Sequence, residues 1–354
     1  MIKVLIVDDS VVAQKLLNYI YSRDDNIQVV GVANSGKEAV EMTLLRQPDV
    51  ISMDINMPGM DGFETTREIM ETRPTPIVIV SATTDTKEVS VAFKIIEAGA
   101  LTAVNRPPAP SHPDFERFAD ELQNTIKVMS EVKVIRRMPK KQTPPTQVMR
   151  ESSAVIRKEK FRIVAIGAST GGPGAIQKIL SGIPKNFPLP ILIIQHIADG
   201  FMAGLADWLS STTGFPVKVG KDGEKILPGI AYLPPDRCNI STDPSGTRLV
   251  CTRYPDDVII SSASHLFKST ARVFGAGAIG ILLTGMGRDG ADELKIMKNR
   301  GGLTIAQDKN SCIVYGMPYE AIKINAESLI LTPEEIGFVL TSLMKEQKIN
   351  FAKV

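Results

Sequence analysis

Cysteine and long apolar runs are scarce in this chain of 354 residues. Its three cysteines, Cys238, Cys251 and Cys312, form no CxxC pair, which argues against a zinc site or a disulfide framework and favours a reducing compartment. No apolar stretch approaches the ~20 residues of a membrane span. The first residues, MIKVLIVDDS, lack the basic region and cleavage site of a signal peptide. We therefore expect a cytoplasmic protein without membrane insertion.

Positive and negative charges nearly balance over the whole chain, whose net charge is +2, but they are unevenly distributed along it. Residues 131–160 hold nine Lys/Arg against three Asp/Glu. A basic run can bind nucleic acid, yet this one also carries prolines, serines and threonines and has no apolar period. A solvated linker over residues 129–160 is the favoured interpretation, and a nucleic-acid-binding arm is the alternative.

The length of the chain favours two domains, since domains usually run to ~100–200 residues. Residues 1–128 alternate short apolar runs with segments of helical spacing, which predicts a five-stranded parallel, flavodoxin-like α/β sheet covered on both faces. The strands are expected at residues 2–8, 27–33, 49–55, 76–82 and 101–105.

Polar side chains follow these predicted strands at the edge where functional sites of parallel sheets lie. Asp8 and Asp9 follow the first strand, Asp54 the third, Ser81 the fourth and Arg106 the fifth. Three converging carboxylates repel one another, and a hard cation such as Mg²⁺ would relieve that repulsion. A carboxylate beside such a cation can attack a phosphoryl group. The alternative for the first two acids is capping of the next helix.

Residues 161–350 again show an α/β pattern, which predicts a second, doubly wound and mostly parallel sheet. Strands are expected at 161–169, 189–196 and 278–286, and helices at 174–183 and 290–301. The segment 215–255 is rich in glycine, proline and short β-type runs. We expect this segment to form hairpins and loops at the edge of the sheet.

The stretch GASTGG, residues 167–172, follows the first of these strands. It fits neither the P-loop, which needs Gly-Lys-Ser/Thr, nor the dinucleotide fingerprint, because Ser169 stands where a glycine is required. GAGAIG at 275–280 matches that fingerprint but precedes a strand, so we treat it as a chance match. GASTG also fits GxSxG, in which small neighbours expose a nucleophilic serine. A helix-capping serine is an equal alternative on this motif alone.

A serine nucleophile needs a base and an acid that orients the base. Of the three histidines only His196 ends a predicted strand of this sheet, and Asp289 lies in the loop TGMGRDG after another. Taken singly, a structural histidine and a helix-capping aspartate are the simpler interpretations. Three strand ends that deliver Ser169, His196 and Asp289 to one edge favour acyl transfer on an ester or amide. Oxyanion donors are expected from the loops at Thr170, Gly171 and Met286.

The first 125 residues resemble the receiver domain of two-component response regulators. The resemblance implies that Asp54 accepts a phosphoryl group from a histidine kinase, that Asp8 and Asp9 help to hold Mg²⁺ and that Ser81 binds the phosphoryl group. Two positions depart from the family pattern. Arg106 stands where the family has a lysine, and Ala103 lies near the place of its usual aromatic switch residue.

The receiver pattern, the basic linker, GASTGG, the pair Gln-His and TGMGRDG, in that order, resemble the chemotaxis protein-glutamate methylesterases of the CheB family. The resemblance implies hydrolysis of glutamate methyl esters on methyl-accepting chemotaxis receptors, with release of methanol, and deamidation of receptor glutamines. It implies activation when the chemotaxis histidine kinase phosphorylates Asp54, and no cofactor for the esterase reaction. Ser264 stands in SASHLF where the family often has an acid.

Other functions stay open at this point. A DNA-binding response regulator would need a basic helix-turn-helix, and the C-terminal half is instead a long α/β unit. A non-enzymatic adaptor would have lost a member of the triad, and all three are present. An esterase of the same mechanism with another methylated signalling protein as its substrate fits the same residues.

Overall fold

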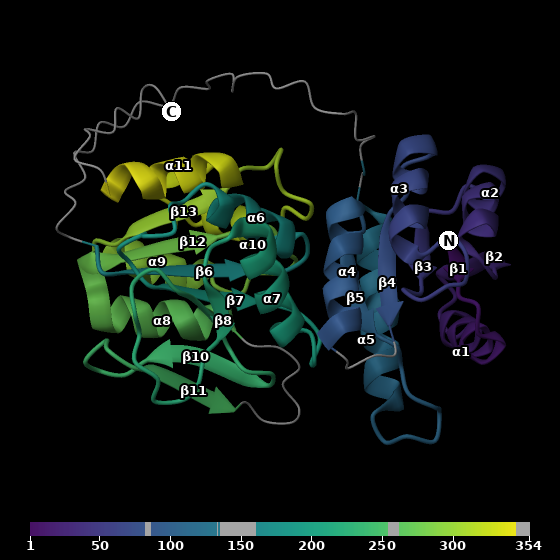
Figure 1. Ribbon diagram of the computed structural model, residues 1–354, viewed down its shortest axis with the longest axis horizontal. Helices are drawn as coiled ribbons and strands as arrows, with labels where there is room; N and C mark the ends of the chain where they lie inside the picture. The colour runs from purple at the N-terminus through teal and green to yellow at the C-terminus, as the bar shows by residue number, and fades with distance from the viewer. Residues whose placement is uncertain (82–85, 133, 135–160, 254–261, 345–354) are drawn as a thin grey trace. The chain divides into compact units, whose positions relative to one another are not determined.

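The computed structural model describes residues 1–81, 86–132, 134, 161–253 and 262–344 (Figure 1). The chain forms two compact units, Met1–Thr143 and Pro144–Val354. Most of the predicted linker, 129–160, and the C-terminal end of the second predicted domain lie outside the described residues. At the start of that linker the last helix of the first unit continues to Ser130.

The first unit is a single parallel sheet with the strand order β2-β1-β3-β4-β5. Its strands are β1 (Ile2–Val7), β2 (Ile27–Ala33), β3 (Val50–Met53), β4 (Ile77–Ser81) and β5 (Thr102–Asn105). Its helices are α1 (Val11–Tyr21), α2 (Gly36–Arg46), α3 (Gly62–Thr72), α4 (Thr86–Ala98) and α5 (Phe115–Ser130). The predicted five-stranded receiver-type fold is confirmed.

Local sequence explains why the helices of the first unit begin where they do. Ser10, Ser35 and Asp61 precede α1, α2 and α3, and each side chain accepts a hydrogen bond from the N–H three residues ahead. The strands between them are apolar runs, and β3 and β4 are buried along their whole length. The order in which strands are added to the sheet reverses between β1 and β3, which are parallel neighbours, and functional sites of such sheets lie at the carboxyl ends of the strands at this point.

The second unit is built on a seven-stranded parallel sheet with the order β14-β13-β12-β6-β7-β9-β8. Its strands are β6 (Ile163–Ala168), β7 (Ile191–Gln195), β8 (Val217–Val219), β9 (Ala231–Leu233), β12 (Ala278–Leu282), β13 (Leu303–Gln307) and β14 (Leu329–Leu331). Its helices are α6 (Gly172–Ser181), α7 (Met202–Thr213), α8 (Ala263–Phe274), α9 (Ala291–Asn299), α10 (Met317–Lys323) and α11 (Pro333–Met344).

Helices lie on both faces of this sheet, as a doubly wound fold requires. Figure 1 shows α6 and α11 on one side of the sheet and α8 on the other. Between the sheet and α8 lies a core of fully buried side chains, among them Ile163, Ile194, Leu266 and Phe267. Strand β6 occupies the centre, with β12 on one side and β7 on the other.

The segment 215–255 agrees only in part with the prediction. β8 and β9 do lie at the edge of the large sheet, but they pair in parallel rather than as a hairpin. A hairpin joins β10 (Cys238–Thr242) to β11 (Leu249–Arg253) and forms a separate two-stranded sheet. Residues 275–277 of GAGAIG form a 3₁₀ turn before β12, not the start of a helix. In the described part of the chain, none of the helices has the length and apolar character of a membrane span.

Candidate functional site

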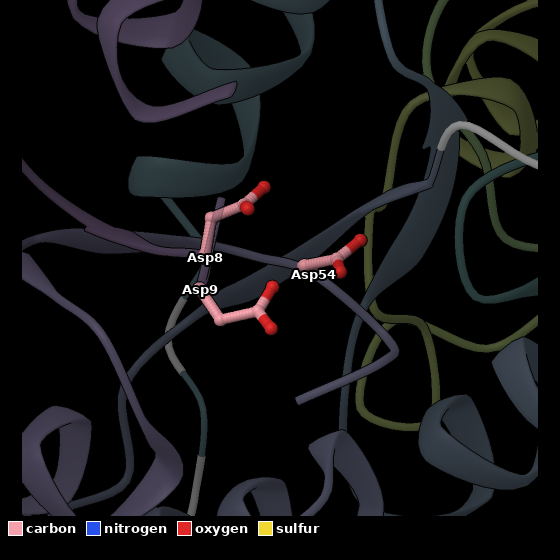
Figure 2. A group of neighbouring side chains, drawn as sticks. All are labelled: Asp8, Asp9 and Asp54. Carbon is pink, nitrogen blue, oxygen red and sulfur yellow. The ribbon is translucent and has the colours of Figure 1, made fainter. Parts of the chain in front are cut away.

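Three carboxylates of the first unit meet at the carboxyl ends of β1 and β3. Asp8 and Asp9 directly follow β1, Asp54 directly follows β3, and one oxygen from each lies within 4.8 Å of the others. Figure 2 shows the three side chains gathered in this way. Asp8 is buried, Asp54 half-buried and Asp9 exposed. Clustered carboxylate oxygens are the donor set that Mg²⁺ prefers, so the residues present fit this ion.

Arg106 brings a positive charge into the same cluster. Its Nη2 atom donates to Asp8 Oδ2 at 2.8 Å and to Asp54 Oδ1 at 2.9 Å. Its backbone N–H donates to the carbonyl of Ser81 at 2.7 Å, which ties the end of β5 to the end of β4. Ser81 itself is buried at the end of β4, beside β3. One guanidinium nitrogen therefore contacts two of the three acids, and its single positive charge offsets only part of their combined negative charge.

Burial raises the pKa of Asp54 to about 6; Arg106 opposes this rise and Asp8 adds to it. The pKa of Asp8 is also raised, mainly by burial, although the Ser10 N–H and Arg106 counteract it. Ser10 is the residue that caps α1, and Asp8 instead accepts the Ser10 N–H at 2.9 Å. The alternative in which these acids serve as the helix cap is therefore wrong.

The turn after β6 presents Ser169 at the carboxyl edge of the second sheet. Gly171 has a φ of +78° and ends the turn as the N-cap of α6, a conformation that favours glycine. A Cβ atom at Gly171 would lie 2.6 Å from Ile313, so space also requires glycine there. A Cβ atom at Gly285, in the loop after β12, would lie 2.5 Å from the Cβ of Ser169. The glycine at 285 thus lets the loop that carries Met286 approach the serine closely.

His196 and Asp289 meet beside this turn. His196 follows β7, its N–H donates to the carbonyl of Ala168 at 2.9 Å, and its side chain is buried. Its Nε2 atom lies 2.9 Å from Asp289 Oδ2. Within the described residues, Ser169 Oγ makes no hydrogen bond to His196. The three predicted residues come from the ends of β6, β7 and β12, which are neighbours at the centre of the sheet.

Asp289 accepts more hydrogen bonds than the one with the histidine. Its Oδ2 accepts the Ala263 N–H at 2.6 Å, and its Oδ1 accepts the Ser264 N–H at 3.0 Å and the Ser262 hydroxyl at 2.9 Å. These donors are the first turn and the N-cap of α8, where the helix dipole also favours a negative charge.

Burial alone would raise the pKa of Asp289. The hydrogen bond and charge of His196, together with the hydrogen bonds from Ser264, outweigh burial and hold the pKa of this carboxyl well below its usual range. We expected a capping role on the following helix as the simple alternative. That alternative is wrong for α9, whose N-cap is Gly290 and has no side-chain cap.

Two buried side chains that the sequence analysis did not single out also contact the Ser169 turn. Gln195 Nε2 donates to the carbonyls of Ser169 and His196, both at 2.8 Å. Thr284 Oγ1 donates to the carbonyl of Thr170 at 2.9 Å. Two signals in the sequence could have pointed to them: Gln195 and Thr284 stand in the motifs Gln-His and TGMGRDG, and one ends β7 while the other follows β12.

Comparison with known proteins finds a matching protein family for each of the two units. Residues 164–340 match the family model described as CheB methylesterase, and residues 4–112 match the one described as response regulator receiver domain. The chain is 47% identical over 347 residues to the protein-glutamate methylesterase/protein-glutamine glutaminase 1 of Syntrophus aciditrophicus, covering 97% of this chain and 98% of that one. It is 45% identical to the corresponding enzyme of Nitrosospira multiformis, over 98% of each chain.

Among solved structures, the catalytic domain of Thermotoga maritima CheB methylesterase is similar, with 33% identity and a TM-score of 0.49, covering 52% of this chain and 98% of that one. The matches to the family models and to full-length relatives cover both units in the same order. This chain therefore belongs to the CheB methylesterase family and carries a response regulator receiver domain ahead of its methylesterase domain.

Proposed function

We propose that this protein is a cytoplasmic, phosphorylation-activated hydrolase that demethylates glutamate methyl esters on methyl-accepting chemotaxis receptors and deamidates receptor glutamines. The observation that carries the proposal is the 2.9 Å contact between His196 Nε2 and Asp289 Oδ2 beside Ser169, at the ends of three adjacent strands. The relatives named protein-glutamate methylesterase/protein-glutamine glutaminase support the same reaction.

In the first half of the proposed reaction, Ser169 Oγ attacks the ester carbonyl while His196 takes the hydroxyl proton. Because Nε2 is engaged by Asp289, the nitrogen left to act as base is Nδ1. We expect substrate binding to bring Ser169 Oγ within hydrogen-bond reach of it. Asp289, held ionised by its donors on α8, stabilises the imidazolium that forms. The oxyanion would be bound by N–H groups at Thr170, Gly171 and Met286.

Collapse of the tetrahedral intermediate breaks the bond to the methoxy group, and His196 returns its proton to the departing oxygen, which leaves as methanol. Water then attacks the acyl-enzyme with His196 again as the base, which frees the glutamate carboxylate and restores Ser169. With a glutamine side chain the same sequence releases ammonia in place of methanol. General-base assistance of this kind contributes ~10²–10⁴ in rate.

In the receiver, Asp54 would accept a phosphoryl group from the chemotaxis histidine kinase. Asp8, Asp9 and Asp54 would hold Mg²⁺, which when bound neutralises charge on the phosphoryl group during transfer. Arg106 contacts two of these carboxylates, and its guanidinium would move toward the negatively charged phosphoryl group. Ser81, at the neighbouring strand end, would donate its hydroxyl to the phosphoryl group.

The test is methanol release from membranes that carry methylated receptors, with and without Mg²⁺ and the small phosphodonor acetyl phosphate. Wild type should release methanol, and acetyl phosphate should speed the release. Asp54→Asn should keep basal release and lose the acceleration, whereas Asp49→Asn, another acid of the same unit but outside the cluster, should keep both. If no methanol appears under any condition, receptor esters are not the substrate.

Arg106→Lys should strengthen activation by acetyl phosphate about fivefold, the ratio that corresponds to ~1 kcal/mol in the switch equilibrium. The forked guanidinium holds Asp8 and Asp54 together through one nitrogen before phosphorylation, and an ammonium is a more compact charge that moves more easily to a phosphoryl group. The measurement is the ratio of methanol release with and without acetyl phosphate. Equal ratios for the two proteins would contradict this expectation.

The cysteines should be poor targets for alkylation, and hydrolysis should not depend on them. Burial raises the pKa of Cys251 to about 11 and that of Cys312 to about 12. At pH 8, iodoacetamide should therefore modify Cys312 roughly 10³-fold more slowly than a free cysteine, whose pKa is about 8.5. Mass spectrometry of the alkylated peptide gives the rate. Rapid alkylation with a parallel loss of hydrolysis would point to a thiol rather than Ser169.

A further inference from the structure

The amide of Gln195 joins the two strand ends that carry Ser169 and His196. The side chain is buried at the end of β7, and its Nε2 atom lies 2.8 Å from the carbonyl oxygen of each of these residues. The orientation of the amide is fixed, because the opposite orientation would set its oxygen against two carbonyl oxygens. A Cβ atom at Gly172 would lie 2.0 Å from Gln195 Oε1, so the chain makes room for this amide.

Thr284 makes an equivalent contact one residue further along the turn. Its hydroxyl oxygen accepts the N–H groups of Ile313 at 3.1 Å and Val314 at 3.0 Å, which occupy its lone pairs. The hydroxyl proton is thus left for a carbonyl, and that of Thr170 at 2.9 Å is the nearer of its two acceptors. The backbone carbonyl of Thr284 in turn accepts the Ser169 N–H at 3.0 Å.

These contacts, together with the Gly172 N–H that donates to the Ser169 carbonyl at 2.8 Å, fix two successive peptide units. In a trans peptide the C=O of one residue and the N–H of the next point in opposite directions. When Gln195 and Thr284 hold the carbonyls of Ser169 and Thr170 toward the interior, the N–H groups of Thr170 and Gly171 must point away from it. Within the described residues, neither N–H donates a hydrogen bond.

We propose that Gln195 and Thr284 are positioning residues that hold the Ser169 turn so that the N–H groups of Thr170 and Gly171 are free to stabilise the oxyanion. This inference rests on the proposed hydrolase function and deepens it. Gln195 acts on His196 as well, because the same nitrogen fixes the carbonyl of the base.

A purely structural role explains Gln195 less well. Its Oε1 atom is buried and, within the described residues, has no hydrogen-bond partner. A methionine of similar length would lose the two donated hydrogen bonds but would also remove this unpartnered oxygen. The two effects on stability oppose each other. The net advantage of the glutamine amide is therefore expected in the reaction rather than in stability.

The experiment uses the full chain with Mg²⁺ and acetyl phosphate, and hydrolysis of p-nitrophenyl acetate as the readout. Gln195→Met and Thr284→Val remove the donors and keep the shape, and Thr284→Ser keeps the hydroxyl. The first two should lower kcat by ~10–100-fold with KM changed less than twofold, since an oxyanion donor acts in the transition state. Thr284→Ser should keep kcat close to the wild-type value, in contrast to Thr284→Val. Labelling of Ser169 by a fluorophosphonate should slow in parallel.

The outcomes separate this inference from the proposed function. Wild-type kcat in both donor-free variants, or a higher KM with an unchanged kcat, would overturn the positioning role while the hydrolase stands. If wild type neither hydrolyses the ester nor is labelled at Ser169, the proposed function fails and the inference falls with it. Thermal unfolding is measured on every variant. Should Gln195→Met prove unstable, the comparison of Thr284→Val with Thr284→Ser decides.

Discussion

Ser169→Ala should lower methanol release from methylated receptor membranes by roughly 10⁶-fold, the size of the loss when the serine of a triad is removed. Alanine cannot form the acyl-enzyme, and only the oxyanion donors and substrate binding remain to assist water. The fold should be unaffected, because Ser169 Oγ makes no hydrogen bond within the described residues and its backbone contacts do not depend on the side chain.

Ser181→Ala is the matched control for this variant. Ser181 is an exposed serine at the end of α6, the helix that follows the Ser169 turn. It should release methanol at the wild-type rate and should still be labelled by a fluorophosphonate, while Ser169→Ala should not be labelled. Substantial release by a well-folded Ser169→Ala protein would mean that another group is the nucleophile, and the Ser-His-Asp mechanism would have to be abandoned.

Asp289→Asn should lower the same activity by ~10⁴-fold, as in other triads where the acid becomes an amide. The carboxylate accepts four hydrogen bonds, from His196, Ala263, Ser262 and Ser264. An asparagine has one acceptor oxygen and one donor nitrogen. Its NH₂ group must therefore lie against at least one of the four groups that donate to the carboxylate in the wild type. Either His196 is held in the wrong tautomer or the start of α8 loses a partner.

The same variant has a distinctive effect on stability. The pKa of Asp289 is lower in the folded chain than its ordinary value, so its contribution to stability is complete above the unfolded pKa of about 3.9 and is lost as the pH falls through the folded pKa. The difference in unfolding free energy between wild type and Asp289→Asn should therefore shrink as the pH falls from about 4 into strong acid. Denaturant unfolding at several pH values measures it.

Asp292→Asn provides the control for the loss of methanol release. Asp292 is an exposed acid in the first turn of α9 and pairs with Arg288 at 2.7 Å. Its loss should leave methanol release near the wild-type rate, because a surface ion pair of this kind contributes little. If Asp292→Asn were as inactive as Asp289→Asn, the effect would belong to the loop as a whole and not to the carboxylate that contacts His196.

The parts of the structure that sequence could predict are those set by local patterns. The segments of β1, β6 and β7 could be predicted as strands because they are continuous apolar runs. Parallel strands place the residues that follow them at one edge of the sheet. That logic was sufficient to bring His196 and Asp289 together. It also placed Asp8, Asp9 and Asp54 in one cluster.

What sequence could not predict depends on contacts between segments that are distant along the chain. Asp289 was expected, as the simple alternative, to cap the helix that follows it, but its carboxylate lies at the start of α8, which precedes it in the chain. β8 and β9 carry only three residues each, too few for a periodicity that distinguishes a parallel pair from a hairpin. The hydrogen bonds of Gln195 could not be predicted, because the partners of a buried amide depend on the segments that pack around it.

The pairing of β6 with both β7 and β12 sets an order for folding of the second unit. β7 follows β6 after a single helix, whereas β12 begins only at Ala278, beyond the β10–β11 hairpin and α8. Closing that longer loop costs more chain entropy, so the β6–β7 pair is expected to form first. A nascent chain would then hold Ser169 and His196 before Asp289 arrives. Newly made protein should therefore stay inactive toward esters until the centre of its sheet is complete.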